Sequence, residues 1–179
     1  MKILSTEILL KTKFLEMKAT EYKDNKDQTK FWVWVSRPNK VKSVVIVAKV
    51  LDKLAVIKEY RIPISDYEFG FPAGLIDKDE SIEEAATREL KEECGLTLTK
   101  VLKVSPFVYN SVGLTDESSA ILYCEAVGEI SLKENEASED IQAYLMNKED
   151  ILNIMQNPNN KIGCKAWIIF NQFIETGKV

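Results

Sequence analysis

Short apolar stretches separated by polar turns run through most of the chain and predict a protein rich in β-strands. Residues 31–35 read Phe-Trp-Val-Trp-Val, and aromatic and β-branched side chains at this density are typical of a strand. Residues 43–50 are almost continuously apolar, as expected of a buried strand. Polar residues at 52 and 53 then turn the chain, and the apolar pattern returns over 54–60 as a second strand.

The rest of the pattern alternates between strands, helices and loops. Further strands are expected within 3–14 and at 69–73, 96–104, 107–109, 119–127 and 142–146. Loops are expected where polar residues, glycine or proline interrupt the pattern, at 21–30, 63–68, 111–117 and 131–140. Helices are expected at 148–155, after a capping asparagine at 147, and at 163–176. Strands mixed with helices in this way predict an α/β sandwich.

One further helix is predicted at 82–94, with signals at both ends. Ser81 is a good N-cap and Glu84 lies three residues on, so the two form a capping box. Gly95 suits the C-terminal end, because glycine adopts the left-handed conformation without a steric cost. The residues between are mostly Ala, Leu, Glu, Lys and Arg, which are strong helix formers.

Two faces of this helix differ in polarity. The apolar side chains recur every four residues, at Ile82, Ala86 and Leu90. The carboxylates of Glu89, Glu92 and Glu93 share another face, where like charges repel by about a few tenths of a kcal/mol per pair. A hard divalent cation would offset this repulsion, since Mg²⁺ prefers carboxylate oxygens and keeps waters that leave room for substrate phosphates. The alternative is a solvated acidic face without a ligand.

The segment 74–96 resembles the Nudix box, whose pattern is G-x5-E-x7-R-E-U-x-E-E-x-G-U with U a bulky aliphatic residue. All the fixed positions match, at Gly74, Glu80, Arg88, Glu89, Leu90, Glu92, Glu93, Gly95 and Leu96. A match at this many positions is far more specific than a short glycine pattern and outweighs the solvated-face alternative. The chain is therefore identified as a member of the Nudix hydrolases, whose fold is an α/β/α sandwich with a mixed sheet.

The resemblance implies a role for each polar residue of the box. The implied metal ligands are Glu89, Glu92, Glu93 and the main-chain carbonyl of Ala73, with Glu80 as a weaker ligand or a support of the loop. Glu92 and Glu93 are also implied in catalysis, together with Arg88, which would hold a glutamate in place. The implied cofactor is Mg²⁺, with Mn²⁺ as the alternative.

Flanking segments resemble ADP-ribose and nucleoside-diphosphate-sugar pyrophosphatases. Residues 59–61 and 71–77 are similar to their (Q)YR…PAG(L)ID pattern, and residues 111–117 to their SPG-x-x-x-E loop. The implied activity is cleavage of the diphosphate of ADP-ribose or a related nucleoside diphosphate sugar. The implied substrate-binding residues are Arg61, Trp32, Trp34, Gly74, Gly113 and Glu117. The alternative for the tryptophans is packing in the sheet, and for the arginine a surface ion pair.

In the resembling pyrophosphatases a glutamate from the loop at 131–140 acts as the catalytic base. Glu139 fits that position best and Glu136 is the second candidate, while a solvated connector is the alternative for the whole loop. Glu59, Gly70 and Val112 depart from the pyrophosphatase pattern but leave the metal residues intact. Other substrates therefore stay open, namely a GDP- or UDP-sugar or a damaged nucleoside triphosphate, as does a non-catalytic nucleotide-sensing module.

Composition narrows the chemistry and the partners. Histidine is absent, which excludes Ser-His and Cys-His nucleophile pairs and His-ligated zinc, so carboxylates must do any acid–base work. Cys94, Cys124 and Cys164 are widely spaced and odd in number, which indicates reduced thiols in a cytoplasmic protein. The net charge of −4 and the lack of a basic block argue against a nucleic-acid partner. No apolar run approaches the ~18 residues of a membrane span, so no membrane partner is expected.

The length of 179 residues suits one domain with a small addition. We expect a small N-terminal antiparallel β region at 1–40 and the Nudix hydrolase domain at 41–179. ADP-ribose pyrophosphatases often exchange an N-terminal sheet within a dimer and bring an aromatic side chain to the partner's site. The resemblance therefore implies a homodimer formed through the region 1–40.

Overall fold

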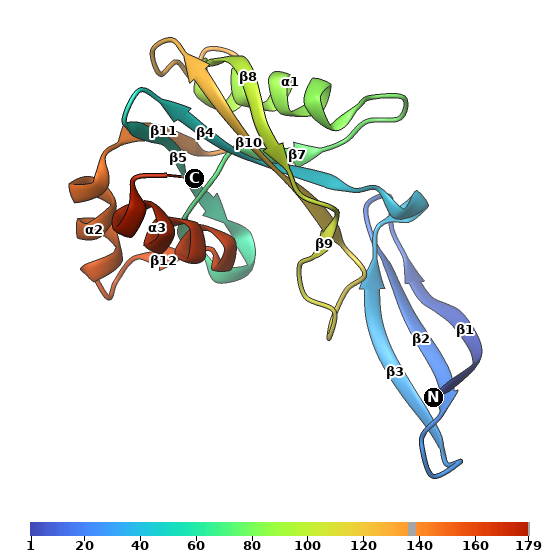
Figure 1. Cartoon of the computed structure of the whole chain (residues 1–179). Helices are drawn as coiled ribbons and strands as arrows, with labels where there is room; N and C mark the ends of the chain where they lie inside the picture. Colours follow the sequence, from blue (N-terminus) through green and yellow to red (C-terminus); the bar gives the residue numbers. More distant parts are fainter. Residues whose placement is uncertain (136–138, 179) are drawn as a thin grey trace. The chain divides into compact units, whose positions relative to one another are not determined.

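The computed structural model describes residues 1–135 and 139–178 (Figure 1). The chain forms two compact units. The first unit comprises Met1–Ser43 and Phe107–Ser119, and the second unit comprises Val44–Pro106 and Ala120–Val179. A segment from the middle of the chain therefore belongs to the same unit as the N-terminus.

The first unit is built on a three-stranded antiparallel sheet. Its strands are β1 (Lys2–Lys11), β2 (Glu16–Lys23) and β3 (Thr29–Ser36), with β2 between the other two. The predicted N-terminal antiparallel β region is thereby confirmed. The predicted loop at 21–30 is wrong at its edges, because Tyr22 pairs with Lys30 and extends the strand ladder toward the turn. The unit also contains the short strand β9 (Val108–Tyr109), which pairs with the first two residues of β10 (Ser118–Val127).

The strands of the second unit form a mixed sheet. They are β4 (Ser43–Val50), β5 (Lys53–Arg61), β6 (Asp66–Gly70), β7 (Ala73–Leu75), β8 (Thr97–Val104), β10, β11 (Ile141–Met146) and β12 (Lys161–Ile162). The main order is β12-β6-β5-β4-β10-β8, with β11 on β5 and β7 on β4. β12 runs parallel to β6, whereas β5 is antiparallel to β4, β6 and β11.

Helices cover both faces of this sheet (Figure 1). α1 (Ile82–Cys94) lies on one face, and α2 (Lys148–Gln156) and α3 (Cys164–Thr176) lie on the other. The continuous apolar run of β4 explains this layering, because its residues alternate between two cores. Val44 and Ile46 pack in the core with α1, while Val45 packs in the core with α2 and α3. The predicted α/β/α sandwich is confirmed.

No strand was predicted at β2 or β12, and two predictions between β5 and the box are inaccurate. The expected loop at 63–68 is wrong at its end, because β6 begins at Asp66, where it pairs with Arg61 of β5. The expected strand at 69–73 is divided between β6 and β7. The helix predicted at 82–94 has the predicted bounds.

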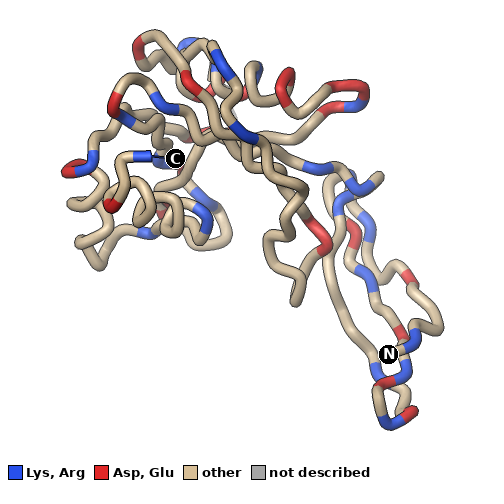
Figure 2. The backbone as a smooth tube through the Cα atoms, in the orientation of Figure 1, with Lys and Arg blue, Asp and Glu red and all other residues tan. Residues whose placement is uncertain are grey.

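Charged side chains of both signs are interspersed along the backbone (Figure 2). In the described part of the chain, no helix is long and apolar enough to cross a membrane.

Candidate active site

The caps of α1 set the position of the polar residues of the box. The Ser81 hydroxyl accepts the Glu84 N–H at 3.2 Å, and the Glu84 carboxylate accepts the Ser81 N–H at 2.8 Å. At the other end of α1, the backbone of Gly95 adopts the left-handed conformation, with φ of 73°. Buried side chains such as Leu90 hold the helix on the sheet, so its acidic residues have a fixed orientation.

Arg88 binds three of the box carboxylates. Its Nε and Nη2 donate to the two oxygens of Glu80, both at 3.0 Å. Its Nη1 donates to Glu89 at 2.7 Å and to Glu92 at 3.1 Å, and Nη2 also reaches the Leu75 carbonyl at 3.0 Å. The hydrogen bonds from Arg88 lower the pKa of Glu80, and those carboxylates raise the pKa of Arg88. The arginine therefore offsets the repulsion that the sequence predicted for this face.

Gly74 makes room for the carboxylate of Glu89. A Cβ atom at position 74 would lie 1.7 Å from Glu89 Oε1, a distance that no pair of non-bonded atoms tolerates. The absence of a side chain thus lets the carboxylate lie against the backbone where the box begins.

Glu93 is the most buried acid of the box, with 3% of its surface exposed. Its Oε2 accepts the Ala73 N–H at 3.1 Å. The pKa of Glu93 is raised to about 9, mainly by burial; the Ala73 hydrogen bond lowers it, and the nearby charges of Glu89, Glu139 and Glu59 contribute to the rise. The ionised form is therefore disfavoured here unless a positive charge is close.

The structure brings the predicted base close to the box. Glu139 interacts electrostatically with Glu59, Glu89 and Glu93. Burial, the largest cause, also raises the pKa values of Glu59 and Glu89, and the charge of Glu139 adds to both shifts. The buried or half-buried acids of α1 and β5 thus lie within electrostatic reach of Glu139, which is itself exposed.

Main-chain pairing fixes the place of this segment. The Tyr60 N–H donates to the Asp140 carbonyl at 3.0 Å, and Ile141 lies opposite Glu59 in the β11–β5 ladder. Glu139 therefore lies beside the end of β5, although it is 80 positions from Glu59 in sequence. Glu136, the second candidate base, lies outside the described residues.

The donor set fits a hard divalent cation. It consists of carboxylate oxygens and main-chain carbonyls, the ligands that Mg²⁺ prefers. Within residues 1–135 and 139–178, no three Asp, Glu or Cys side chains converge closely enough to hold a metal ion. Arg88 instead binds Glu89 and Glu92, so the metal ligands stay a prediction.

Arg61 lies at the end of β5 between two acids. Its Nη1 is 2.5 Å from Glu59 and its Nε is 3.5 Å from Glu68, which faces Glu59 across the β5–β6 ladder. The predicted ion-pair alternative is therefore real, yet 45% of the Arg61 side chain is exposed and available for a further contact. Glu59 was not predicted as a site residue. Its position two residues after Ile57, which packs with α1 as Ala55 does, places its side chain on the same face of β5.

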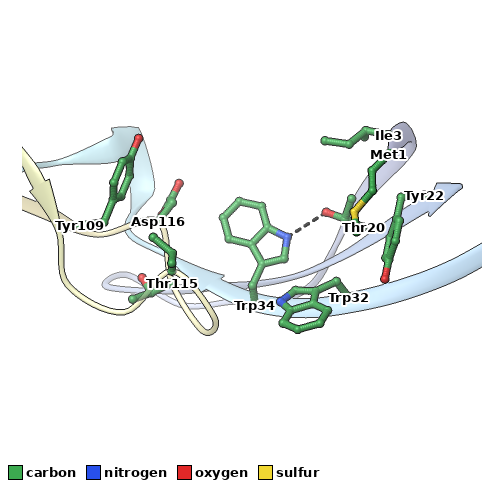
Figure 3. A pocket seen from close by; sticks show the side chains of 10 residues that line it. Met1, Ile3, Thr20, Tyr22, Trp32, Trp34, Tyr109, Thr115 and Asp116 are labelled. Atoms are coloured by element: carbon green, nitrogen blue, oxygen red, sulfur yellow. Dashed lines mark hydrogen bonds between the residues drawn. The ribbon is translucent and has the colours of Figure 1, made fainter. Parts of the chain in front are cut away.

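The predicted substrate residues of the first unit also have defined partners. The Trp34 indole N–H donates to Thr20 Oγ1 at 2.8 Å, and the Trp32 N–H donates to the Gly113 carbonyl at 3.2 Å. Figure 3 shows both indoles beside a pocket of this unit. Trp32 is 51% exposed, which argues against core packing as its role.

Glu117 ties the loop at 111–117 to the end of β3. It accepts a hydrogen bond from Arg37 Nε at 2.6 Å, and another from Asn110 at 3.2 Å. Arg37 was not predicted as a site residue, since no local pattern connects it with Glu117, 80 residues away.

Comparisons with known proteins match this chain to the family that the box resembles. The model of the NUDIX domain family matches residues 39–167. The ADP compounds hydrolase NudE of Escherichia coli is 46% identical over 80 residues, which are 42% of this chain and 43% of that protein. The ADP-sugar pyrophosphatase of Mus musculus is 33% identical over 123 residues, which are 64% of this chain and 56% of that protein. These two matches thus span about half of each relative's own length.

A solved structure shares the fold over nearly the whole chain. The crystal structure of an ADP compounds hydrolase superposes with a TM-score of 0.79 at 23% identity, covering 99% of this chain and 96% of that one. At this level of identity the likeness shows the fold alone.

Proposed function

The chain belongs to the Nudix family, and from this premise we propose that it is a metal-dependent hydrolase of ADP-ribose or a related nucleoside diphosphate sugar. The observation that carries the proposal is the geometry of the intact box, in which Arg88 binds Glu80, Glu89 and Glu92 and the buried Glu93 accepts the Ala73 N–H. Nudix hydrolases generally use divalent metal ions, and among these Mg²⁺ suits the oxygen donors here, with Mn²⁺ as the alternative.

The box residues would hold the metal. Glu89, Glu92 and Glu93 supply carboxylate oxygens, and Ala73 supplies its carbonyl. When bound, the cation neutralises charge on the phosphoryl oxygens and makes a water more acidic. Arg88 and Glu80 keep the helix carboxylates in place through the hydrogen bonds described above.

Glu139 would accept the proton of the attacking water. The water oxygen forms a bond to one phosphorus of the diphosphate, the bridging P–O bond breaks, and the leaving phosphate keeps the bridging oxygen. For ADP-ribose the products are AMP and ribose 5-phosphate. Glu136 is the second candidate for this role.

The remaining predicted residues would bind the substrate. Arg61 offers its exposed guanidinium to a phosphate or ribose. Trp32 and Trp34 offer aromatic faces, on which a base stacks with a gain of about 1–3 kcal/mol. Gly74, Gly113 and Glu117 complete this set by their places in the box and in the loop at 111–117.

We also propose that the protein is a homodimer formed through the N-terminal region 1–40. Every residue of β1 is exposed, including Ile8 and Leu10, and Phe14 and Phe31 are 66% and 67% exposed. Exposed apolar side chains in such numbers are typical of an interaction surface. The three unpaired cysteines fit a reducing compartment, which favours a cytoplasmic location.

A hydrolysis screen with product identification tests the function. Purified protein is incubated with and without Mg²⁺ against ADP-ribose, a GDP-sugar, a UDP-sugar and an oxidised nucleoside triphosphate. We expect Mg²⁺-dependent release of AMP and ribose 5-phosphate from ADP-ribose. Glu93→Gln should lower turnover by about 10²-fold or more while the protein stays folded, because a buried acid at the metal site is lost.

Glu83→Gln is the matched control, since Glu83 lies on the same helix but is exposed. It should retain the parent rate. If another nucleotide were hydrolysed faster than ADP-ribose, the protein would still be a Nudix hydrolase, but with a different substrate. Nucleotide binding without hydrolysis would instead indicate a sensing module and refute the enzymatic proposal.

A further inference from the structure

The first unit contains a pocket of about 590 Å³ that is lined mainly by apolar and aromatic side chains (Figure 3). Trp32 and Trp34 form part of its wall, and Tyr109, Thr115 and Asp116 come from the segment around 109–116. All of these residues belong to the first unit, so the pocket is complete within it.

Several polar groups of the pocket walls already have partners, while Tyr22 and Tyr109 add hydroxyl-bearing rings to the lining. Both indole N–H groups donate inside the protein, to Thr20 and to the Gly113 carbonyl. The Thr115 hydroxyl accepts the Glu117 N–H at 3.1 Å. Trp32, which is 51% exposed, therefore offers its ring face to a ligand together with the part of Trp34 that lines the pocket, which favours a flat ring but does not distinguish one ring from another.

Asp116 differs from the other residues that line the pocket in its charge. Of the described residues that line the pocket, it has the only charged side chain, and it is only partly exposed. Its Oδ2 accepts a hydrogen bond at 3.2 Å from the hydroxyl of Ser36, which is fully buried and shares its proton with the Arg37 carbonyl at the same distance. This bond orients the carboxylate and leaves Oδ1 able to accept from a ligand.

A carboxylate beside aromatic faces suits either a cation or a neutral N–H donor. The ammonium of Lys18 already lies 5.1 Å from the centre of the Trp34 ring, which disfavours a second cation on that ring. A flat ring that carries an N–H donor fits both the faces and the carboxylate.

We propose that Asp116 is a specificity-determining residue that selects a nucleobase with an exocyclic amino group, such as adenine, against its keto analogue hypoxanthine. Asp116 accepts the hydrogen bond of the amino group, whereas the keto oxygen of hypoxanthine meets a second acceptor at the same place. The inference rests on the proposed function, because it takes the ligand to be a nucleotide.

Tryptophan fluorescence measures the binding directly, without hydrolysis. The full-length protein is titrated with AMP and with IMP, and quenching reports Kd. We expect AMP to bind about tenfold more tightly than IMP, as is typical when a polar group is left facing the wrong partner. In Asp116→Asn the preference should fall to about twofold or less, because an amide can donate to the keto oxygen as well as accept from the amino group.

Asp27→Asn is the matched control, since it is the same change at an exposed turn of the first unit. It should keep the parent preference. Ser36→Ala serves as an independent test if Asp116→Asn does not fold, and it should reduce the preference because the carboxylate loses its orienting bond.

Equal binding of AMP and IMP by the parent protein would overturn the proposal, and so would an unchanged preference in Asp116→Asn. The experiments distinguish failure of the proposed enzymatic function from failure of the proposed role of Asp116. An AMP preference that depends on Asp116 without hydrolysis of any substrate refutes the enzymatic function but supports this site. Hydrolysis of ADP-ribose and its hypoxanthine analogue at equal kcat/KM refutes this site but supports the enzyme.

Discussion

A single arginine organises the acidic residues of the box. Arg88 donates to Glu80, Glu89 and Glu92 from one partly buried guanidinium. An isolated surface ion pair contributes little to stability, but a network with several short hydrogen bonds orients its members. Glu89 and Glu92 thereby have defined positions before any cation arrives.

Gly74→Ala tests whether the position of Glu89 matters for catalysis. The new Cβ would overlap the Glu89 carboxylate, so this side chain must move away from the start of the box. We expect turnover to fall by about 10²-fold, because a displacement of about 1 Å at a catalytic group has that effect. Initial rates with ADP-ribose and Mg²⁺ measure the loss.

Gly70→Ala is the control for this change. A Cβ at position 70 meets no heavy atom within 4 Å, so the variant should keep a rate close to that of the parent. Parent-like turnover in Gly74→Ala would show that catalysis does not depend on where Glu89 lies.

The site residues of the box could be predicted from the sequence, because their spacing along one helix determines which side chains lie together. Glu59 and Asp116 could not be assigned in the same way. Glu59 lies opposite Ile141, 82 positions away, in the β5–β11 ladder, and Asp116 meets Ser36 across 80 positions. Contacts of this kind depend on the tertiary fold and leave only a weak local signal.

At the scale of elements, α1 must begin at a fixed residue for the box to work. If the sequence of α1 shifted by one residue along the helix, every carboxylate would turn by about 100° around the helix axis. The reciprocal hydrogen bonds of Ser81 and Glu84 prevent this shift.

Ser81→Ala should lower the free energy of unfolding by about 1 kcal/mol, because the Glu84 N–H loses its acceptor at the helix start. Denaturant unfolding followed by circular dichroism measures the change. In the control Thr87→Ala, an exposed hydroxyl that bonds to the Glu83 carbonyl of its own helix is removed, and stability should change by less than about 0.5 kcal/mol. Equal effects of the two variants would contradict a capping role for Ser81.

Elements with strong local signals were predicted closely. The strand at 43–50 and the helix at 82–94 have the expected bounds, since apolar runs and caps are local properties. β6 was missed at its start and β12 altogether, because their polar residues become strands only by pairing with each other and with β5.

At the scale of the whole molecule, the exposed apolar side chains of the first unit require an explanation. Ile8→Glu should convert the proposed dimer to a monomer, because a charge would be buried at the interface. Light scattering after size-exclusion chromatography, over a range of protein concentrations, measures the mass. The control Ile168→Glu changes an exposed residue of α3 and should leave the dimer intact. A parent protein that is monomeric at every concentration would refute the proposed dimer.

The composition of the first unit could not have been predicted from the order of residues along the chain. Its second segment, Phe107–Ser119, joins the N-terminal strands through long-range contacts such as Arg37–Glu117. Hydrophobic periodicity describes neighbours in sequence, and it does not show which distant segments share a unit.

Arg88 has one more consequence. Because the molecule carries its own internal counterion at the acidic helix, the polypeptide can reach its native shape before any dissolved ion is captured. If the proposed metal site is correct, folding and metal binding are separate steps, so a lower concentration of free divalent ions would reduce turnover without reducing the amount of folded protein.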